Sequence, residues 1–229
     1  MTHPPSLNPL VQSLLLAVPE LMSSLERVQL ALGPWSEQPE GGCNFLYFPE
    51  DALLGVSALV QPHRMAQGVR LSWLGCRGVW SAQQALGNGL QAQVMTAGAA
   101  FRVPEAVLHS LDKSLATWWL QVAASAQQLV TQMAQMSFCA RHHTAEQGLA
   151  SWLLMAWHNS PGHALQIPVA SLQGGFGFPS EKWQLAWQTL RSQGVVVLTE
   201  PGDLAEIAPR LLEPLSGLAC ACHQKFQLH

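Results

Sequence analysis

Short apolar segments separated by turn-forming residues dominate the first hundred positions of the chain. The runs FLYF from Phe45, LLGVSALV from Leu53 and VRLSWLG from Val69 lie between stretches rich in Gly, Pro, Asn and Asp. This pattern is typical of short antiparallel strands in a sandwich or barrel. The segment from Pro9 to Leu32 differs, because its first apolar residues recur at helical spacing, and it predicts a helix that covers the strands.

The pattern changes after Pro104. The stretch from Leu108 to Ala140 contains neither Pro nor Gly, and its apolar positions recur at steps of three and four residues. This spacing predicts one long helix with a heptad-like seam, about 45 Å long at 1.5 Å per residue. A helix of that length favours pairing with a second copy of the chain, and burial within one chain is the alternative. The expected dimer contacts are Leu111, Leu115, Trp118, Val122, Leu129, Met133 and Met136.

Cap residues and periodicity predict a compact helical unit after the long helix. Thr144 and Gln147 have capping-box spacing, which indicates the start of a second helix. Ser180 is suited to begin a further helix and Gly194 to end it. Apolar runs on either side of an EPGD turn predict a hairpin, and a last helix is expected over Pro209–Phe226. Short helices, a helix in the position of a recognition helix and a hairpin together indicate a winged helix-turn-helix.

Composition narrows the setting and the partners. The chain has 229 residues, 48% of them hydrophobic and 11% charged, which favours a compact and well-buried protein. Its net charge of −3 supplies no general attraction to nucleic acid, so any DNA contact must be local. No apolar run reaches membrane-spanning length and no signal peptide is recognisable. Five scattered cysteines favour the reducing cytoplasm over a disulfide framework, and no membrane partner is expected.

Signatures of catalysis and of metal binding are weak. The sequence contains no P-loop, no nucleophile elbow and no Cys–His pair of specific spacing, so we expect no enzyme and no catalytic residues. Cys220 and Cys222, followed by His223, come nearest to a metal site, but no second pair stands at zinc spacing. We therefore expect a small-residue face on a packed helix there, with no metal and no cofactor. His142 and His143 are interpreted as a polar helix junction.

Several stretches, in order along the chain, resemble the Crp/Fnr transcription regulators. They are LYFPEDALLGVSALV from Leu46, LGCRGVWSAQQALG from Leu74, AFRVPEAVL from Ala100, CARHHTAEQGLASWLLMA from Cys139 and LACACHQ from Leu218. The resemblance implies an α+β fold with an N-terminal antiparallel β-roll, or double-stranded β-helix, as a sensor over residues 1–107. It further implies a dimerisation helix over 108–142 and a winged helix-turn-helix over 143–229, acting as a homodimer on DNA.

Two sensor chemistries of this family are not expected. Members that bind cyclic nucleotides hold the phosphate with Glu and Arg in the β-roll, yet the corresponding stretch Gly78–Ala92 contains neither. Oxygen sensors of the family use clustered N-terminal cysteines, whereas only Cys43 precedes Cys76 here. The signal is thus an unidentified small molecule or protein. Candidate pocket residues are Arg70, Trp73, Arg77 and Trp80, with a solvated face or core packing as the alternative.

The resemblance assigns DNA contacts to the helix that follows Ser180. The expected contacts are Lys182, Gln184, Gln188 and Arg191. The sequence between Leu165 and Leu215 contains three basic and five acidic residues, so this part of the chain carries a net charge of −2. Two interpretations therefore stay open. One is a dimeric regulator that reads DNA, and the other is a degenerate member, a dimeric ligand-sensing or protein-interaction module with Phe176, Phe178 and Trp183 as anchors.

Overall fold

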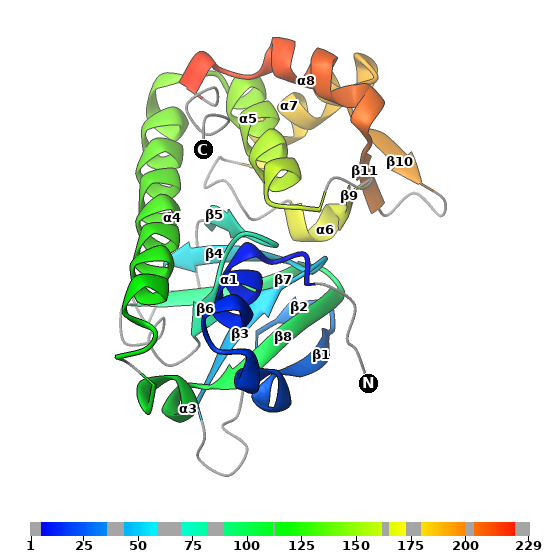
Figure 1. Cartoon of the computed structure of the whole chain (residues 1–229). Coiled ribbons are helices and arrows are strands. Elements are labelled where there is room, and N and C mark those ends of the chain that lie inside the picture. Colours follow the sequence, from blue (N-terminus) through cyan, green and yellow to red (C-terminus); the bar gives the residue numbers. More distant parts are fainter. Residues whose placement is uncertain are drawn as a thin grey trace.

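The structure is a computed structural model of the chain, and it describes residues 6–35, 44–58, 70–81, 89–111, 113–161, 165–172, 180–199 and 204–222. A strand-rich N-terminal half, one long helix and a mainly helical C-terminal half follow one another along the sequence (Figure 1). The long helix α4 runs along one side of both halves. The α+β fold class expected from the resemblance is confirmed.

In the described part, the N-terminal half consists of two four-stranded antiparallel sheets. Their strand orders are β1-β8-β3-β6 and β2-β7-β4-β5, the crossed connectivity of a β-roll. The strands are β1 (Glu26–Leu30), β2 (Gly33–Pro34), β3 (Phe45–Pro49), β4 (Leu53–Ala58), β5 (Arg70–Leu74), β6 (Trp80–Ser81), β7 (Leu90–Thr96) and β8 (Gly98–Pro104). The three apolar runs quoted above form β3, β4 and β5, as their composition predicts.

The segment before the β-roll is helical only in part. Helix α1 (Pro9–Ala17) is capped by the Asn8 side chain, and the 3₁₀ helix η1 (Pro19–Ser24) follows it. Proline at position 19 has no backbone N–H to continue α1, and the residues from Glu26 onward pair with β8 instead. The prediction of one helix reaching Leu32 is therefore wrong in its second half.

The predicted long helix is divided into two. Helix α3 (Glu105–His109) ends in a turn, and α4 (Ala116–His142) begins seven residues after it. The Ser110 hydroxyl donates to the Val107 carbonyl within this turn, a local bond that competes with a continuing helix. Leu108 and Leu115 are both fully buried on either side of it. Because two consecutive helices preserve the same steps of three and four, periodicity could not show the break.

The apolar seam predicted for dimer contacts faces the chain's own core. Leu115, Trp118 and Met136 are at most 4% exposed, and the Trp118 indole N–H donates to the Leu10 carbonyl at 2.8 Å. The side chains of Leu111, Val122 and Leu129 pack against the same cores, and Met133 is half-buried. The chain's own halves thus cover Leu115, Trp118 and Met136, which corrects their assignment to a dimer interface. For Leu111, Val122, Leu129 and Met133, which keep part of their surface exposed, the assignment stays a prediction.

The C-terminal half has the elements of a winged helix-turn-helix. They are α5 (Ala145–His158), β9 (Leu165–Pro168), α6 (Val169–Leu172), α7 (Ser180–Ser192), β10 (Val197–Thr199), β11 (Leu204–Ile207), the 3₁₀ helix η3 (Pro209–Leu211) and α8 (Leu212–Leu218). Strands β10 and β11 form the predicted hairpin, and β9 pairs with β11. The Thr144–Gln147 capping box forms with both bonds at 3.2 Å. The last helix ends at Leu218, short of the predicted end.

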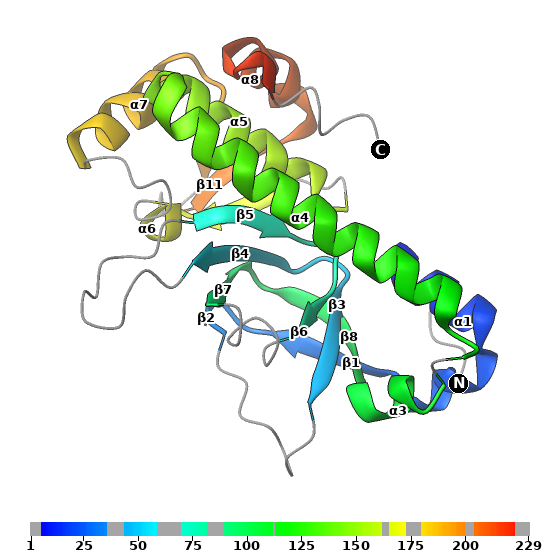
Figure 2. The same ribbon diagram turned by 90° about the vertical axis from the view of Figure 1, so that its left-hand side faces the viewer.

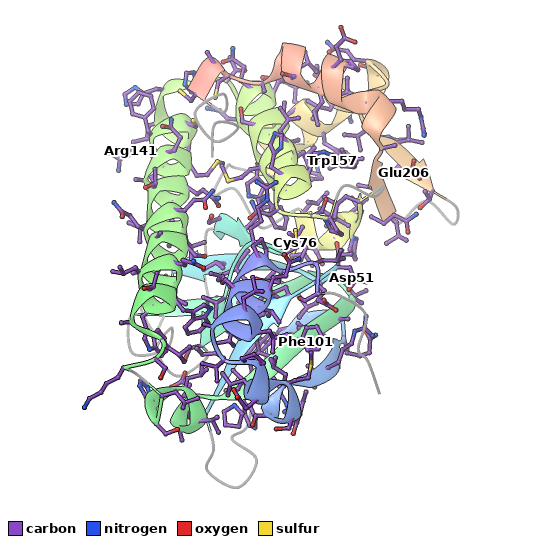
Figure 3. The ribbon with its side chains drawn as sticks, in the orientation of Figure 1. Asp51, Cys76, Phe101, Arg141, Trp157 and Glu206 are labelled. Carbon is purple, nitrogen blue, oxygen red and sulfur yellow. The ribbon has the colours of Figure 1, made fainter. Side chains whose placement is uncertain are left out.

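One hydrophobic cluster joins the two halves. Leu53, Trp73 and Met95 of the β-roll belong to the same buried cluster as α5 and the core of the C-terminal half. The Trp73 indole lies 4.3 Å from the Trp152 ring between centroids, and its N–H donates to the Trp152 carbonyl at 2.9 Å. A backbone bond from Cys76 to the Asn159 carbonyl adds to this junction, which lies where Cys76 and Trp157 are labelled in Figure 3. The two halves therefore share a core rather than meeting across a solvated interface.

We predict that Trp73→Ala destabilises the protein by about 3–5 kcal/mol, since it removes a large buried side chain and its hydrogen bond. The free energy of unfolding from a denaturant titration gives this value. The variant should also unfold in two transitions, one for each half. The exposed control Leu185→Ala should stay within about 0.5 kcal/mol of the unmodified chain. A loss at Trp73 no larger than in that control would show that the halves are not coupled through this residue.

Candidate functional site

The outer face of α7 is the candidate nucleic-acid interface. Gln184, Gln188 and Arg191 follow each other at steps of four and three, and all three side chains are exposed. Lys182 is exposed in the first turn. The opposite face of α7 is buried in the shared core through Trp183, Ala186, Trp187 and Leu190. In Figure 2, α7 lies at the edge of the molecule away from the β-roll. All four predicted contact residues are therefore accessible.

A glycine determines where α7 ends. Gly194 has a φ of +67°, a left-handed conformation that residues with a side chain rarely adopt. Its N–H bonds the Arg191 carbonyl at 2.9 Å, and the Val195 N–H bonds the Leu190 carbonyl at 3.1 Å. This closing turn fulfils the predicted role of Gly194 as a C-terminal cap. It turns the chain away after Ser192, which leaves the Arg191 side chain on the last turn of the exposed face.

The charges around α7 are mixed. Glu181 is exposed beside Lys182 in the first turn, and Leu185 is 61% exposed on the same side. Arg210 forms an ion pair with Glu206 at 3.2 Å. Trp183 is only 5% exposed and stacks on Trp187, so it fills the core and is not an exposed anchor. Phe176, Phe178, Glu200 and Asp203 lie outside the described residues.

The predicted pocket residues of the β-roll separate in the structure. Trp73 and Arg77 line a small cleft between the β-roll and α4, together with Ser125, Gln128 and Gln132. Arg77 is exposed and extends along a neighbouring groove between α1 and α4. Trp80 is 4% exposed and packs in the core between the sheets, away from this cleft and groove, which favours the core-packing alternative for this residue. The Arg70 side chain and residues 82–88, in the expected phosphate-binding stretch, lie outside the described part.

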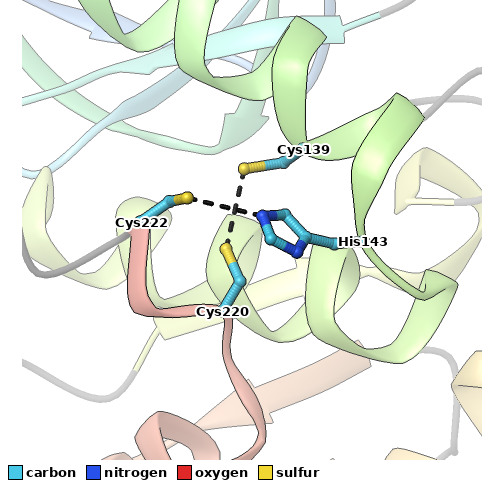
Figure 4. A group of neighbouring side chains, drawn as sticks. All are labelled: Cys139, His143, Cys220 and Cys222. Carbon is cyan, nitrogen blue, oxygen red and sulfur yellow. Dashed lines mark hydrogen bonds between the residues drawn. The ribbon is translucent and has the colours of Figure 1, made fainter.

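Four side chains from distant parts of the sequence meet where α4, α5 and α8 converge (Figure 4). Their ligand-type atoms all lie within 4.8 Å of one another, and the residues are Cys139, His143, Cys220 and Cys222. Cys139 lies in the last turn of α4, and His143 caps that helix. Because α8 ends at Leu218, the chain is extended at Ala219 and brings both C-terminal cysteines to this place. The expectation that they form the face of a packed helix is therefore wrong.

Hydrogen bonds organise the four side chains. The Cys139 and Cys220 sulfurs lie 3.6 Å apart, and the Cys222 sulfur lies 3.4 Å from His143 Nε2. Burial raises the pKa of Cys139 to about 12. Burial also acts to raise the pKa of Cys220, but hydrogen bonds with Ser151 and Cys139 outweigh it and lower the pKa. Cys220 is thus the thiol of this pair that loses its proton first. Sequence reasoning missed the cluster because Cys139 and Cys220, one from each of its two halves, lie 81 residues apart.

These elements define a fold class. A β-roll of two antiparallel sheets, a long helix beside it and a C-terminal winged helix-turn-helix are the architecture of the Crp/Fnr-type transcription regulators. No protein-family model matches the sequence. No curated protein matches it either. In the described part, no helix has the length and apolar character that crossing a bilayer requires.

Solved structures support this class. FixK2 from Bradyrhizobium japonicum is similar with a TM-score of 0.60 and 12% identity, over 86% of this chain and 98% of that one. A CRP/FNR-family transcriptional regulator from Thermus thermophilus gives a TM-score of 0.56 at 15% identity, over 85% and 98%. CLP from Xanthomonas campestris, described as a c-di-GMP-responsive global regulator, gives 0.56 at 11%, over 84% and 98%. At these identities the likeness establishes the fold.

Gly194→Ala and Gly217→Ala should change stability in opposite directions. At both positions an added methyl group meets no atom within 4 Å, so only the backbone distinguishes them. Gly194→Ala should cost about 1–2 kcal/mol, because alanine is strained at positive φ. Gly217 lies inside α8, where alanine should stabilise by about 0.5–1 kcal/mol. Thermal unfolding of both variants measures these two changes in stability. An unchanged stability of Gly194→Ala would contradict the described end of α7.

Proposed function

We propose that the chain is a cytoplasmic, homodimeric transcriptional regulator that contacts DNA through α7 and senses a signal other than cyclic AMP. The observation that carries the proposal is the exposed face of α7. It offers two amides and two cations on a winged helix whose opposite face is anchored in the core. Glutamine can pair with a base edge in the major groove, and Lys and Arg neutralise phosphates. The Crp/Fnr-type fold supports the same assignment.

The proposed dimer uses the outer face of α4. Leu120, Val130 and Phe138 are 71%, 63% and 49% exposed on the side opposite the buried seam. With two alanines and one glutamine they form a stripe at steps of three and four, consisting of Leu120, Ala123, Gln127, Val130, Ala134 and Phe138. No Asp, Glu, Lys or Arg occurs between Ala116 and Ala140. An exposed, uncharged stripe with near-heptad spacing suits a second copy of the same helix.

The proposed signal acts between the β-roll and α4. Arg77 and the amides Gln128 and Gln132 meet at the cleft described above, so they would recognise a polar group rather than a purely apolar ligand. CLP, described as responding to c-di-GMP, illustrates that this fold serves ligands other than cyclic AMP. Movement of α4 would reach the winged helix directly, because α4 leads into α5 after His143.

Val130→Glu should convert the dimer into a monomer, because it places two like charges at an apolar contact. Light scattering coupled to gel filtration should give twice the chain mass of 24.9 kDa for the unmodified protein and the single mass for the variant. The matched control is Val197→Glu on β10, another exposed valine, which should remain dimeric. A monomeric unmodified chain, or a dimeric Val130→Glu, would contradict this use of α4.

DNA binding should be selective and dependent on salt. The full chain is incubated with a library of genomic fragments between about 50 and 200 mM salt, where phosphate contacts weaken measurably. We expect retention of a palindromic site. Arg191→Ala should lower the slope of log affinity against log salt by about 2, roughly 0.9 for each subunit. The control Arg210→Ala removes the same charge from a residue already paired with Glu206, and it should leave the slope unchanged.

One observation favours a second candidate function. The exposed face of α7 also carries Glu181 and the 61% exposed Leu185, which suit a protein partner better than a phosphate backbone. A folded dimer that retains no DNA fragment even at low salt would support this function. The chain would then be a dimeric module whose winged helix binds a protein.

A further inference from the structure

The geometry of the four-residue cluster matches a tetrahedral metal site. With zinc–sulfur bonds of about 2.3 Å and zinc–nitrogen bonds of about 2.0–2.1 Å, tetrahedral ligands lie about 3.8 Å apart for two sulfurs and about 3.6 Å for sulfur and nitrogen. The Cys139–Cys220 sulfurs are 3.6 Å apart, and Cys222 Sγ lies 3.4 Å from His143 Nε2. All remaining pairs lie within 4.8 Å. Small side-chain shifts therefore suffice to place one ion within bonding distance of all four atoms.

We propose that Cys139, His143, Cys220 and Cys222 bind one zinc ion that holds the end of α4 to the segment after α8. Three thiolates and one imidazole are a ligand set of structural zinc sites. An iron–sulfur cluster distributes its ligands over two or more irons and requires them farther apart than a single ion does. Cys139 and Cys220 are 2% and 3% exposed, and the other two ligands are half-buried, which fits a closed site. This inference does not depend on DNA binding.

Neighbouring groups support the ligands. The Ser151 hydroxyl accepts the Cys220 backbone N–H at 3.0 Å, which leaves its own proton for the Cys220 sulfur at 3.1 Å. The Gln135 side-chain amide donates to the Cys139 sulfur at 3.4 Å. Hydrogen bonds of this kind orient metal-bound thiolates and stabilise their charge. The C-terminal end of α4, which carries partial negative charge, adds an environment that favours a cation.

The bound ion would restrain the junction between the long helix and the winged helix. Two ligands belong to the end of α4, two follow α8, and Ser151 of α5 contacts one of them. Without a metal, α8 and the segment after it are held by packing on α5 and the helical core and by the hydrogen bonds of Cys220 and Cys222. With a metal, the angle between α4 and α5 and the position of α8 become coupled through bonds rather than packing.

The test uses the full chain without an affinity tag, purified under reducing conditions, because histidine tags bind metals themselves. Elemental analysis should find one zinc per chain. Replacement with Co²⁺ should give the intense visible absorption of a tetrahedral site and a thiolate-to-cobalt charge-transfer band. A chelator competition gives the affinity. Ser151→Ala should weaken zinc binding by about 10–100-fold, since it removes only a supporting bond.

Two cysteine variants distinguish a proposed zinc ligand from a cysteine outside the cluster. Cys222→Ser removes a half-buried ligand and should reduce zinc affinity more than Ser151→Ala does. Cys76→Ser is the matched control, because Cys76 is a buried thiol of the β-roll outside the cluster, and it should keep one zinc per chain. Three results would overturn the proposal. They are an unmodified chain that takes up neither zinc nor cobalt, equal affinity in the Cys76 and Cys222 variants, and a Cys139–Cys220 disulfide that persists under the reducing conditions of the purification.

Discussion

The contact between Trp73 and Trp152 is the constraint on which the arrangement of the molecule depends. Trp73 is 1% exposed in β5 and Trp152 is fully buried in α5, and they join sheets and helices that are 79 residues apart in sequence. Two indoles in contact bury a large apolar area, and the indole-to-carbonyl bond gives that contact one orientation. Since α5 also carries the core of the C-terminal half, the position of the winged helix follows from this contact.

Local signals in the sequence proved reliable where a few adjacent residues decide the structure. The strands at Phe45, Leu53 and Arg70, the capping box at Thr144 and the cap at Gly194 are all present. Each depends on side-chain spacing or backbone freedom within a short stretch. Patterning and caps also placed the strand-rich half before the helical one, and the family resemblance added that the strands form a β-roll.

The predictions that failed concern contacts between residues that lie far apart in the sequence. The spacing in α4 correctly identifies an apolar face, but it does not state whether that face meets a partner or the chain's own halves. The structure shows the latter for Leu115 and Trp118. Likewise, the sequence around Cys220 and Cys222 predicts a continuing helix, whereas the helix α8 ends at Leu218 and the chain is extended at Ala219. Their proximity to Cys139 exists only once α4, α5 and α8 have packed, so no spacing in the sequence encodes it.

The absence of charged side chains along most of α4 has a consequence for how the molecule responds to its medium. Between Lys113 and Arg141 the sequence contains no Asp, Glu, Lys, Arg or His. Dissolved ions weaken interactions between charges, and this part of the helix carries no charges that they could screen. Salts that are excluded from protein surfaces, such as sulfate, strengthen apolar contacts instead. Contacts through Lys182 or Arg191 weaken under the same conditions. A rise in ionic strength therefore acts in opposite directions on the two exposed faces of one chain.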